Sequence, residues 1–375
     1  MSKLVRRFAL VSLVFPVLGL IGPAEAVGFG SNVEWVGTVP LTNDSAGGRR
    51  FGNYFYLTSS TALHIFDISD PLNPTRVGLL QFSQDPQFAQ EDVDTNGRIL
   101  LIGDSVIDVT DKTKPAVLST HGLVSHTISC VLDCNWAYGS DGRILDLRTP
   151  ANPRLSSLRW NTISPNTGRH DVTEVAPGLL MTSSDPMLFL DARMDPERPV
   201  LIGRGPTRGR FTHGNLWPQQ AQDDFLLVHG ESGAGSGCPS ADAQFVTMDA
   251  TKGHPTYDEQ GNITKLGEFT QIDEYRVRAG TYTDGHPAMN VYCTHWADIH
   301  PSYKDGGLLA MAWYEHGVRM LDIKPDGQIE ERGWFVPIGG STSGVYWITD
   351  RIMYTTDYQR SMDILRYTGP LPASA

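Results

Sequence analysis

Beyond residue 26 the sequence contains no apolar run long enough to cross a lipid bilayer as a helix. It is also poor in positive charge, since 30 Lys and Arg stand against 42 Asp and Glu. The net charge of −12 argues against nucleic acid or an anionic membrane surface as a partner. Helical periodicity is missing as well, because no stretch of useful length repeats its apolar residues every three to four positions. These absences indicate an all-β protein without a transmembrane segment after residue 26.

The first 26 residues have the pattern of a secretory signal peptide. Three basic residues precede an apolar stretch over residues 8–21, and residues 24–26 (AEA) supply small side chains for cleavage. A membrane anchor is the alternative, but the apolar run is short and contains Pro16. We therefore expect an exported protein, secreted or periplasmic. Two adjacent arginines near the N-terminus leave both the general and the twin-arginine export routes open.

Cysteine is scarce, and the four residues present are Cys130, Cys134, Cys238 and Cys293. An even number of cysteines in an exported chain predicts two disulfides. We expect Cys130 to pair with Cys134 inside one hairpin, and Cys238 to pair with Cys293 across a long intervening region. A metal site of four thiolates is the alternative, although the spacing of Cys130 and Cys134 is wider than in a usual zinc knuckle.

One sequence repeat recurs along the chain: an apolar strand, a turn, a second strand that ends near an Asp, another turn and a third strand. The seven copies lie at residues 54–80, 99–118, 136–155, 179–203, 225–269, 308–333 and 352–365. In the fifth copy, the third strand is expected at residues 265–269. Each copy has room for one more strand before it, so each predicts a four-stranded blade.

The seventh copy lacks its third strand, and residues 33–39 resemble the strand that is missing. Because an open sheet edge is a liability, a ring of blades has to close. We therefore predict an all-β, seven-bladed β-propeller whose last blade is closed by the N-terminal strand. The expected domain covers residues 27–370, with a tail at 371–375. Insertions that depart from the repeat are expected at about residues 230–262 and 271–293.

The segments at residues 63–68 (LHIFDI) and 318–323 (VRMLDI) resemble the repeats of the LVIVD-repeat family of secreted bacterial propellers. The resemblance extends over nearly the whole chain after residue 26 and implies the propeller fold. It implies little about activity, because the family is not defined by one function.

The first strand of each blade lines the axis of a propeller, and its first residue lies at the mouth of the central channel. Aligning the copies places histidine at this position in the third to the sixth copy: His126, His170, His213 and His295. The second copy has Glu91 there, and Asp171 directly follows one of the histidines. Histidine makes up only 11 of 375 residues, so its agreement with the repeat phase indicates a shared role in the channel.

Converging imidazoles favour a metal site, because neutral imidazole is a good ligand for copper, iron and zinc. Glu91 and Asp171 are then expected to ligate the ion or to orient a histidine from behind. The alternative is that each histidine bonds the backbone of the neighbouring blade, but a hallmark of that kind should recur in most copies. We predict a copper or iron site, with zinc as a further option, formed by His126, His170, His213 and His295.

This placement of axial histidines is similar to that in two propeller groups, the iron-dependent carotenoid-cleaving oxygenases and the copper-dependent methanethiol oxidases of the selenium-binding group. The resemblance concerns architecture and histidine placement, and it implies an oxidase or oxygenase that acts on a small molecule. Two alternatives stay open. One is a non-catalytic extracellular propeller that binds a protein or a glycan, and the other is a lyase or hydrolase that uses a divalent ion as Lewis acid.

Overall fold

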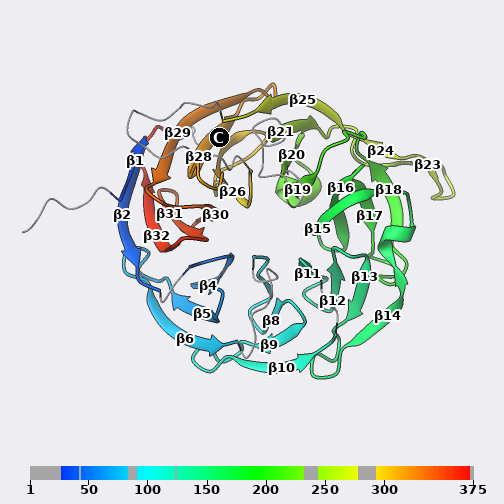
Figure 1. Cartoon of the computed structure of the whole chain (residues 1–375). Helices are drawn as coiled ribbons and strands as arrows, with labels where there is room; N and C mark the ends of the chain where they lie inside the picture. Colours follow the sequence, from blue (N-terminus) through cyan, green and yellow to red (C-terminus); the bar gives the residue numbers. More distant parts are fainter. Residues whose placement is uncertain are drawn as a thin grey trace, which may run out of the picture.

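The computed structural model describes residues 27–41, 44–82, 91–122, 125–231, 244–277 and 293–371. Within them, seven sheets of four or five strands each form a ring (Figure 1). This ring confirms the predicted seven-bladed β-propeller. The predicted signal peptide and residues 372–375 of the predicted tail lie outside the described residues. Where the structure describes the chain, no helix is long and apolar enough to span a membrane.

The first four blades run from the inner strand outward in chain order. Blade one contains β3 (Gly48–Phe51), β4 (Tyr54–Thr58), β5 (Ala62–Asp67) and β6 (Thr75–Gln81). Blade two contains β7 (Asp94–Thr95), β8 (Ile99–Ile102), β9 (Ser105–Asp108) and β10 (Ala116–Thr120). Blade three contains β11 (Ile128–Val131), β12 (Trp136–Gly139), β13 (Arg143–Asp146) and β14 (Arg154–Arg159). Blade four contains β15 (Thr167–Ala176), β16 (Leu179–Asp185), β17 (Leu188–Asp191) and β18 (Val200–Arg204), with β24 (Gly267–Glu268) at its edge.

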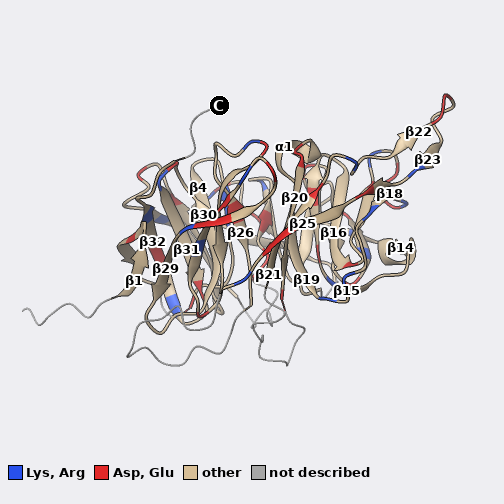
Figure 2. Cartoon of the chain, turned by 90° about the horizontal axis from the view of Figure 1, so that it is seen from above, with Lys and Arg blue, Asp and Glu red and all other residues tan. Residues whose placement is uncertain are grey.

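The last three blades recruit strands from elsewhere in the chain or carry additions. Blade five contains β19 (Thr212–Leu216), β20 (Phe225–Gly230), β21 (Gln244–Asp249) and β25 (Thr270–Tyr275). Blade six contains β26 (Ala297–Ile299), β27 (Gly307–Ala312), β28 (Val318–Ile323), β29 (Ile329–Pro337) and β1 (Gly28–Ser31). Blade seven contains β30 (Thr342–Trp347), β31 (Ile352–Asp357), β32 (Arg360–Tyr367) and β2 (Val33–Val39). A hairpin of β22 (Thr256–Tyr257) and β23 (Ile263–Lys265) projects from the ring (Figure 2). The helical segments are one turn each, a 3₁₀ turn at Trp160–Thr162 and α1 at Pro218–Ala221.

The core lies between the blades rather than at the axis. Strands such as β8 are buried along their whole length, because neighbouring blades cover both of their faces. Outer strands such as β10 are largely exposed. One core cluster joins the sixth and seventh blades through Ala310, Met353 and Leu365, and it also includes Val33 of the N-terminal strand.

Closure of the ring occurs as predicted. β2 pairs in antiparallel register with β32, and Val33 lies opposite Tyr367. The preceding strand β1 was not predicted and adds to blade six through β29. Its glycines permit this close pairing, since a Cβ at Gly30 would lie 2.6 Å from the carbonyl oxygen of Trp334.

Blade five corrects two sequence predictions. Its outer strand is β25, not residues 265–269, and β24 instead pairs in parallel with β18 of blade four. The predicted insertion at 271–293 therefore begins inside a regular strand, and the one at 230–262 contains β21. Ile272 and Tyr275 of β25 pack on the core between blades five and six. This packing explains why β25, and not residues 265–269, forms the outer strand of blade five. Residues 232–243 and 278–292 lie outside the described residues.

The Cys130–Cys134 disulfide is present and spans the turn between β11 and β12. Cys293 is also disulfide-bonded. Cys238, its predicted partner, lies outside the described residues.

The closure strand yields a test of stability. Val33 is 4% exposed in β2, whereas Val117 is 53% exposed in the outer strand β10. We expect Val33→Ala to lower the free energy of unfolding by about 2 kcal/mol through lost packing. The matched variant Val117→Ala should change it by less than about 0.5 kcal/mol. Urea unfolding measures both, and equal losses would contradict a role for β2 in closing the core.

Candidate metal centre

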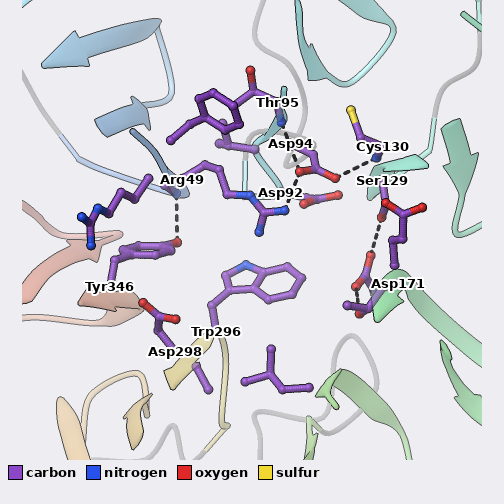
Figure 3. Close-up of a pocket in the computed structure, with 18 of the residues that line it drawn as sticks. Arg49, Asp92, Asp94, Thr95, Ser129, Cys130, Asp171, Trp296, Asp298 and Tyr346 are labelled. Carbon is purple, nitrogen blue, oxygen red and sulfur yellow. Dashed lines mark hydrogen bonds and ion pairs between the residues drawn. The ribbon is translucent and has the colours of Figure 1, made fainter. Parts of the chain in front are cut away.

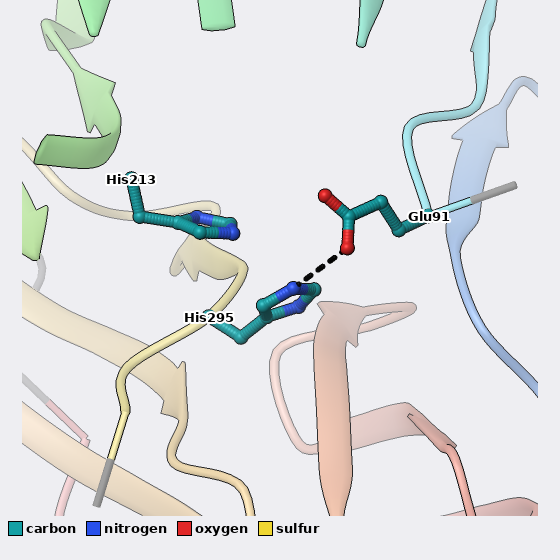
Figure 4. A group of neighbouring side chains, drawn as sticks. All are labelled: Glu91, His213 and His295. Atoms are coloured by element: carbon teal, nitrogen blue, oxygen red, sulfur yellow. Dashed lines mark hydrogen bonds and ion pairs between the residues drawn. The ribbon is translucent and has the colours of Figure 1, made fainter. Parts of the chain in front are cut away.

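Five side chains from five consecutive blades meet near the axis: Glu91, His126, His170, His213 and His295. Each lies in or just before the inner strand of its blade, where the repeat alignment places it. Glu91, His213 and His295 point toward one another (Figure 4). We refer to these five residues as the axial centre.

The carboxylate of Glu91 is in contact with three of the imidazoles. Its Oε1 lies 2.7 Å from Nε2 of His126 and 3.2 Å from Nε2 of His170. Its Oε2 lies 3.0 Å from Nε2 of His295 and accepts a hydrogen bond of 2.9 Å from the hydroxyl of Tyr358. The sequence predicts Glu91 at the same position in its blade as the histidines, and the structure shows its carboxylate in contact with three of them.

His213 completes the group from the other side. Its ring centroid lies 3.9 Å from that of His170 and 4.3 Å from that of His295. Its Nε2 is 4.0 Å from Oε2 of Glu231, whose other oxygen accepts a hydrogen bond of 2.8 Å from Tyr314. The donor atoms form three overlapping triads, each within 4.8 Å: Glu91 with His213 and His295, Glu91 with His126 and His170, and His170 with His213 and Glu231.

The buried nitrogens of this group are poorly satisfied. Within the described residues, no ring nitrogen of His170 or His213 meets the geometry of a hydrogen bond, although Nε2 of His170 contacts Glu91 at 3.2 Å. Leaving a buried polar atom unpaired costs roughly 1–3 kcal/mol. A cation among these nitrogens would remove that cost, so the residues present fit a metal ion.

His295 has the orientation of a metal-ligating histidine. Its Nδ1 donates a hydrogen bond to the backbone carbonyl of Ser343, which leaves Nε2 directed at Glu91. A backbone acceptor behind one ring nitrogen fixes the tautomer and presents the other nitrogen to the ion.

The pKa values show how the centre balances charge without a metal. Burial lowers the pKa of His295, but the charge and hydrogen bond of Glu91, together with Glu231 and the carbonyl of Ser343, raise it overall. At His126, burial also lowers the pKa, but the hydrogen bond and the charge of Glu91 raise it, and the pKa is raised overall. At His213, burial and the charges of His170 and His295 lower the pKa well below its usual range. Glu91 thus favours the charged forms of His126 and His295, and a metal ion at these nitrogens would compete with protons for them.

Three residues beside the centre were missed or misread in the sequence. Glu231, Tyr314 and Tyr358 each follow the end of the second strand of a blade, β20, β27 and β31 respectively. An antiparallel second strand returns to the end of the ring where the first strand begins, so the repeat phase contains a signal for them. None of the three was among the residues predicted for the centre.

Asp171 differs from its prediction. Its carboxylate accepts hydrogen bonds of 3.0 Å from Ser129 and from Thr173, and not from a histidine (Figure 3). Adjacent residues in a strand point to opposite faces, so Asp171 points away from the side occupied by His170. His229, on the inner side of blade five, is also buried. A Cβ at Gly214 would lie 2.4 Å from its ring, so the glycine leaves room for it.

Comparison with known proteins supports the fold. No family model matches the chain, and no curated protein matches it either. Among solved structures, it is similar to the WD40 β-propeller domain of Doa1, with a TM-score of 0.54 and 10% sequence identity over 89% of this chain and 96% of that chain. At this identity the likeness shows the propeller fold alone. The resemblances to the LVIVD-repeat family and to the histidine-containing oxygenases and oxidases remain predictions.

The electrostatics of the axial centre can be tested in metal-free protein. Glu91→Gln keeps the shape of the side chain but removes the charge that raises the pKa values of His126 and His295. We expect both histidines to titrate at a lower pH in the variant than in the parent protein, by NMR of the imidazole protons. His64 serves as an internal control, because burial lowers its pKa to about 4 without Glu91. Unchanged midpoints for His126 and His295 would contradict the contact with Glu91.

Proposed function

We propose that the chain is an exported metalloprotein that binds one transition-metal ion in the axial centre, through His126, His170, His213 and His295 with Glu91. The observation that carries the proposal is that three imidazoles contact one buried carboxylate, Glu91, and that a fourth, His213, packs against two of them. Glu91, His170 and His213 each belong to two of the three donor triads, so an ion in one triad takes a ligand from each of the others. This sharing favours a single ion. Export rests on the N-terminal sequence pattern.

For the chemistry, we favour an oxidase or oxygenase that acts on a small molecule. Copper or iron is suited to a ligand set rich in imidazole and would supply electron exchange with a substrate. Tyr358 and Tyr314 stand beside the centre, and burial raises the pKa of both phenols, so they keep their protons. Their hydrogen bonds hold the carboxylates of Glu91 and Glu231 in place. The side chain of His126 is 42% exposed, which marks the side open to solvent.

Two other functions compete with this proposal. A hydrolase or lyase would use zinc or another divalent ion as Lewis acid, and Glu231 would be the candidate base. A non-catalytic propeller that binds a protein or glycan would need the histidines only as structural groups. Nδ1 of His170 and both ring nitrogens of His213 have no hydrogen bond among the described residues, which speaks against that last role, because a structural histidine bonds its surroundings. His300 illustrates such a residue, with bonds to Ser302 and to the backbone of Asp350.

Metal analysis of the exported protein tests the proposal. We expect one copper or iron ion per chain by elemental mass spectrometry. His170→Ala and His213→Ala should each weaken metal binding by at least about 100-fold, because each removes a ligand. His300→Gln, a buried histidine outside the axial centre, should keep full occupancy.

Two results would contradict the metal centre: protein without any transition metal, or variants of His170 and His213 that bind metal as well as the parent. Circular dichroism and thermal unfolding of each variant show whether the ring is intact. Electron paramagnetic resonance of the bound ion then separates copper or iron from zinc, and with it redox from Lewis-acid chemistry.

A further inference from the structure

A second site lies along the axis on the other side of Trp296. The indole of Trp296 lies 4.8 Å from the ring of His213 and 5.8 Å from that of His295, centroid to centroid. The same side chain lines a cavity of about 580 Å³, whose walls include none of the four axial histidines. Figure 3 shows Trp296 across this space from Asp92 and Asp94. The volume is that of a small-molecule site. We refer to it as the channel cavity.

The walls of the channel cavity follow the repeat. Asp94, Ser129, Thr173 and Asp298 each stand three residues after the axial-centre residue of the same blade. Three residues along a strand correspond to about 10 Å, so the same inner strands build both sites at different depths. Equivalent positions of several inner strands thus form the walls of the cavity.

The lining of the cavity is predominantly acidic. It includes six acidic residues besides Glu91, which are Asp92, Asp94, Asp133, Asp171, Glu174 and Asp298, against the two basic residues Arg49 and Arg50. Burial raises the pKa of Asp298 to about 6 and also raises the pKa values of Asp92 and Glu174, so the negative charge of these carboxyls is poorly compensated. Such a cavity repels anions and attracts a cation.

A residue with a buried, unpaired acceptor also belongs to the lining of this cavity. Asn215 is 3% exposed and lines the cavity. Its amide nitrogen donates to Ser183 at 2.9 Å, which orients the amide, and its Oδ1 has no hydrogen-bond partner among the described residues. An N–H group of a ligand would satisfy this oxygen.

The arrangement selects an organic cation over a metal ion. Among the described residues, every triad that brings its donor atoms within 4.8 Å contains histidine, so no three cavity carboxylates form a compact cage. Carboxylates on different blades suit an extended ligand, and the face of Trp296 adds cation–π attraction for an ammonium group. Arg49 shows the same chemistry from within the chain, because its guanidinium lies 2.6 Å from Asp94.

We propose that the channel cavity binds a small organic cation with one or two primary ammonium groups, independently of the metal centre. The ammonium groups contact the carboxylates of Asp94 and Asp298, donate to Asn215 and lie against Trp296. Arg49 competes with the ligand for the carboxylates.

Isothermal titration of the exported protein with four-carbon probes tests this assignment. We expect 1,4-diaminobutane and butylamine to bind, and butan-1-ol and butyrate not to bind. Asp298→Asn should weaken diamine binding about tenfold by removing one charge. Arg49→Gln should strengthen it several-fold. Asp249→Asn, on the outside of blade five, is the matched control and should leave binding unchanged.

The metal content separates this site from the axial centre. Asp298→Asn should retain the metal of the parent protein, and His213→Ala should retain diamine binding whether or not metal is bound. Equal binding of the alcohol and the amines, an Arg49→Gln variant that binds the diamine no better than the parent, or displacement of the diamine by millimolar calcium would each overturn the proposal. Because Arg49→Gln is expected to gain affinity, a loss of fold cannot produce the expected result.

Discussion

The antiparallel pairing of β2 with β32 joins the two ends of the chain within one sheet and covers the edge that blade seven would otherwise expose. Once the ring is closed, the number of blades sets how far each inner strand lies from the axis. Val33 of β2 packs in the core between blades six and seven, so closure of the ring also contributes to this core. The inner strands can therefore hold polar side chains at the axis, because burial between the blades stabilises the fold.

Two sites follow from this constraint, because every inner strand passes the same two depths. Glu91, His126, His170 and His295 stand at one depth, and residues three positions later line the channel cavity. Trp296 follows His295 directly, just before β26, and its indole contacts the histidines on one side and lines the cavity on the other. The repeating register thus produces a ring rich in imidazole and, beyond it, a ring of polar residues that includes the carboxylates of Asp94 and Asp298.

The repeat phase predicted the blades, their closure and the side chains of the axial centre, because all of these depend on position within a strand–turn–strand unit. It failed where contacts depend on packing between distant segments. β24 joins blade four although it lies some 60 residues after β18, and its Gly267 has no room for a side chain, since a Cβ would lie 1.7 Å from the carbonyl oxygen of Gly253. β1 consists of four residues without a periodic pattern. Asp171 follows His170 in the sequence, but neighbouring residues of a strand face opposite ways. Its carboxylate therefore bonds Ser129 and not a histidine.

Glu91 links the two sites, since its carboxylate contacts three imidazoles and also lines the channel cavity. The same carboxylate raises the pKa values of His126 and His295. One buried acid thus shapes the electrostatics of the imidazoles and also adds an acidic group to the lining of the cavity. Because none of the four axial histidines lines the cavity, a ligand in the cavity has no contact with them, and the two sites can be occupied separately.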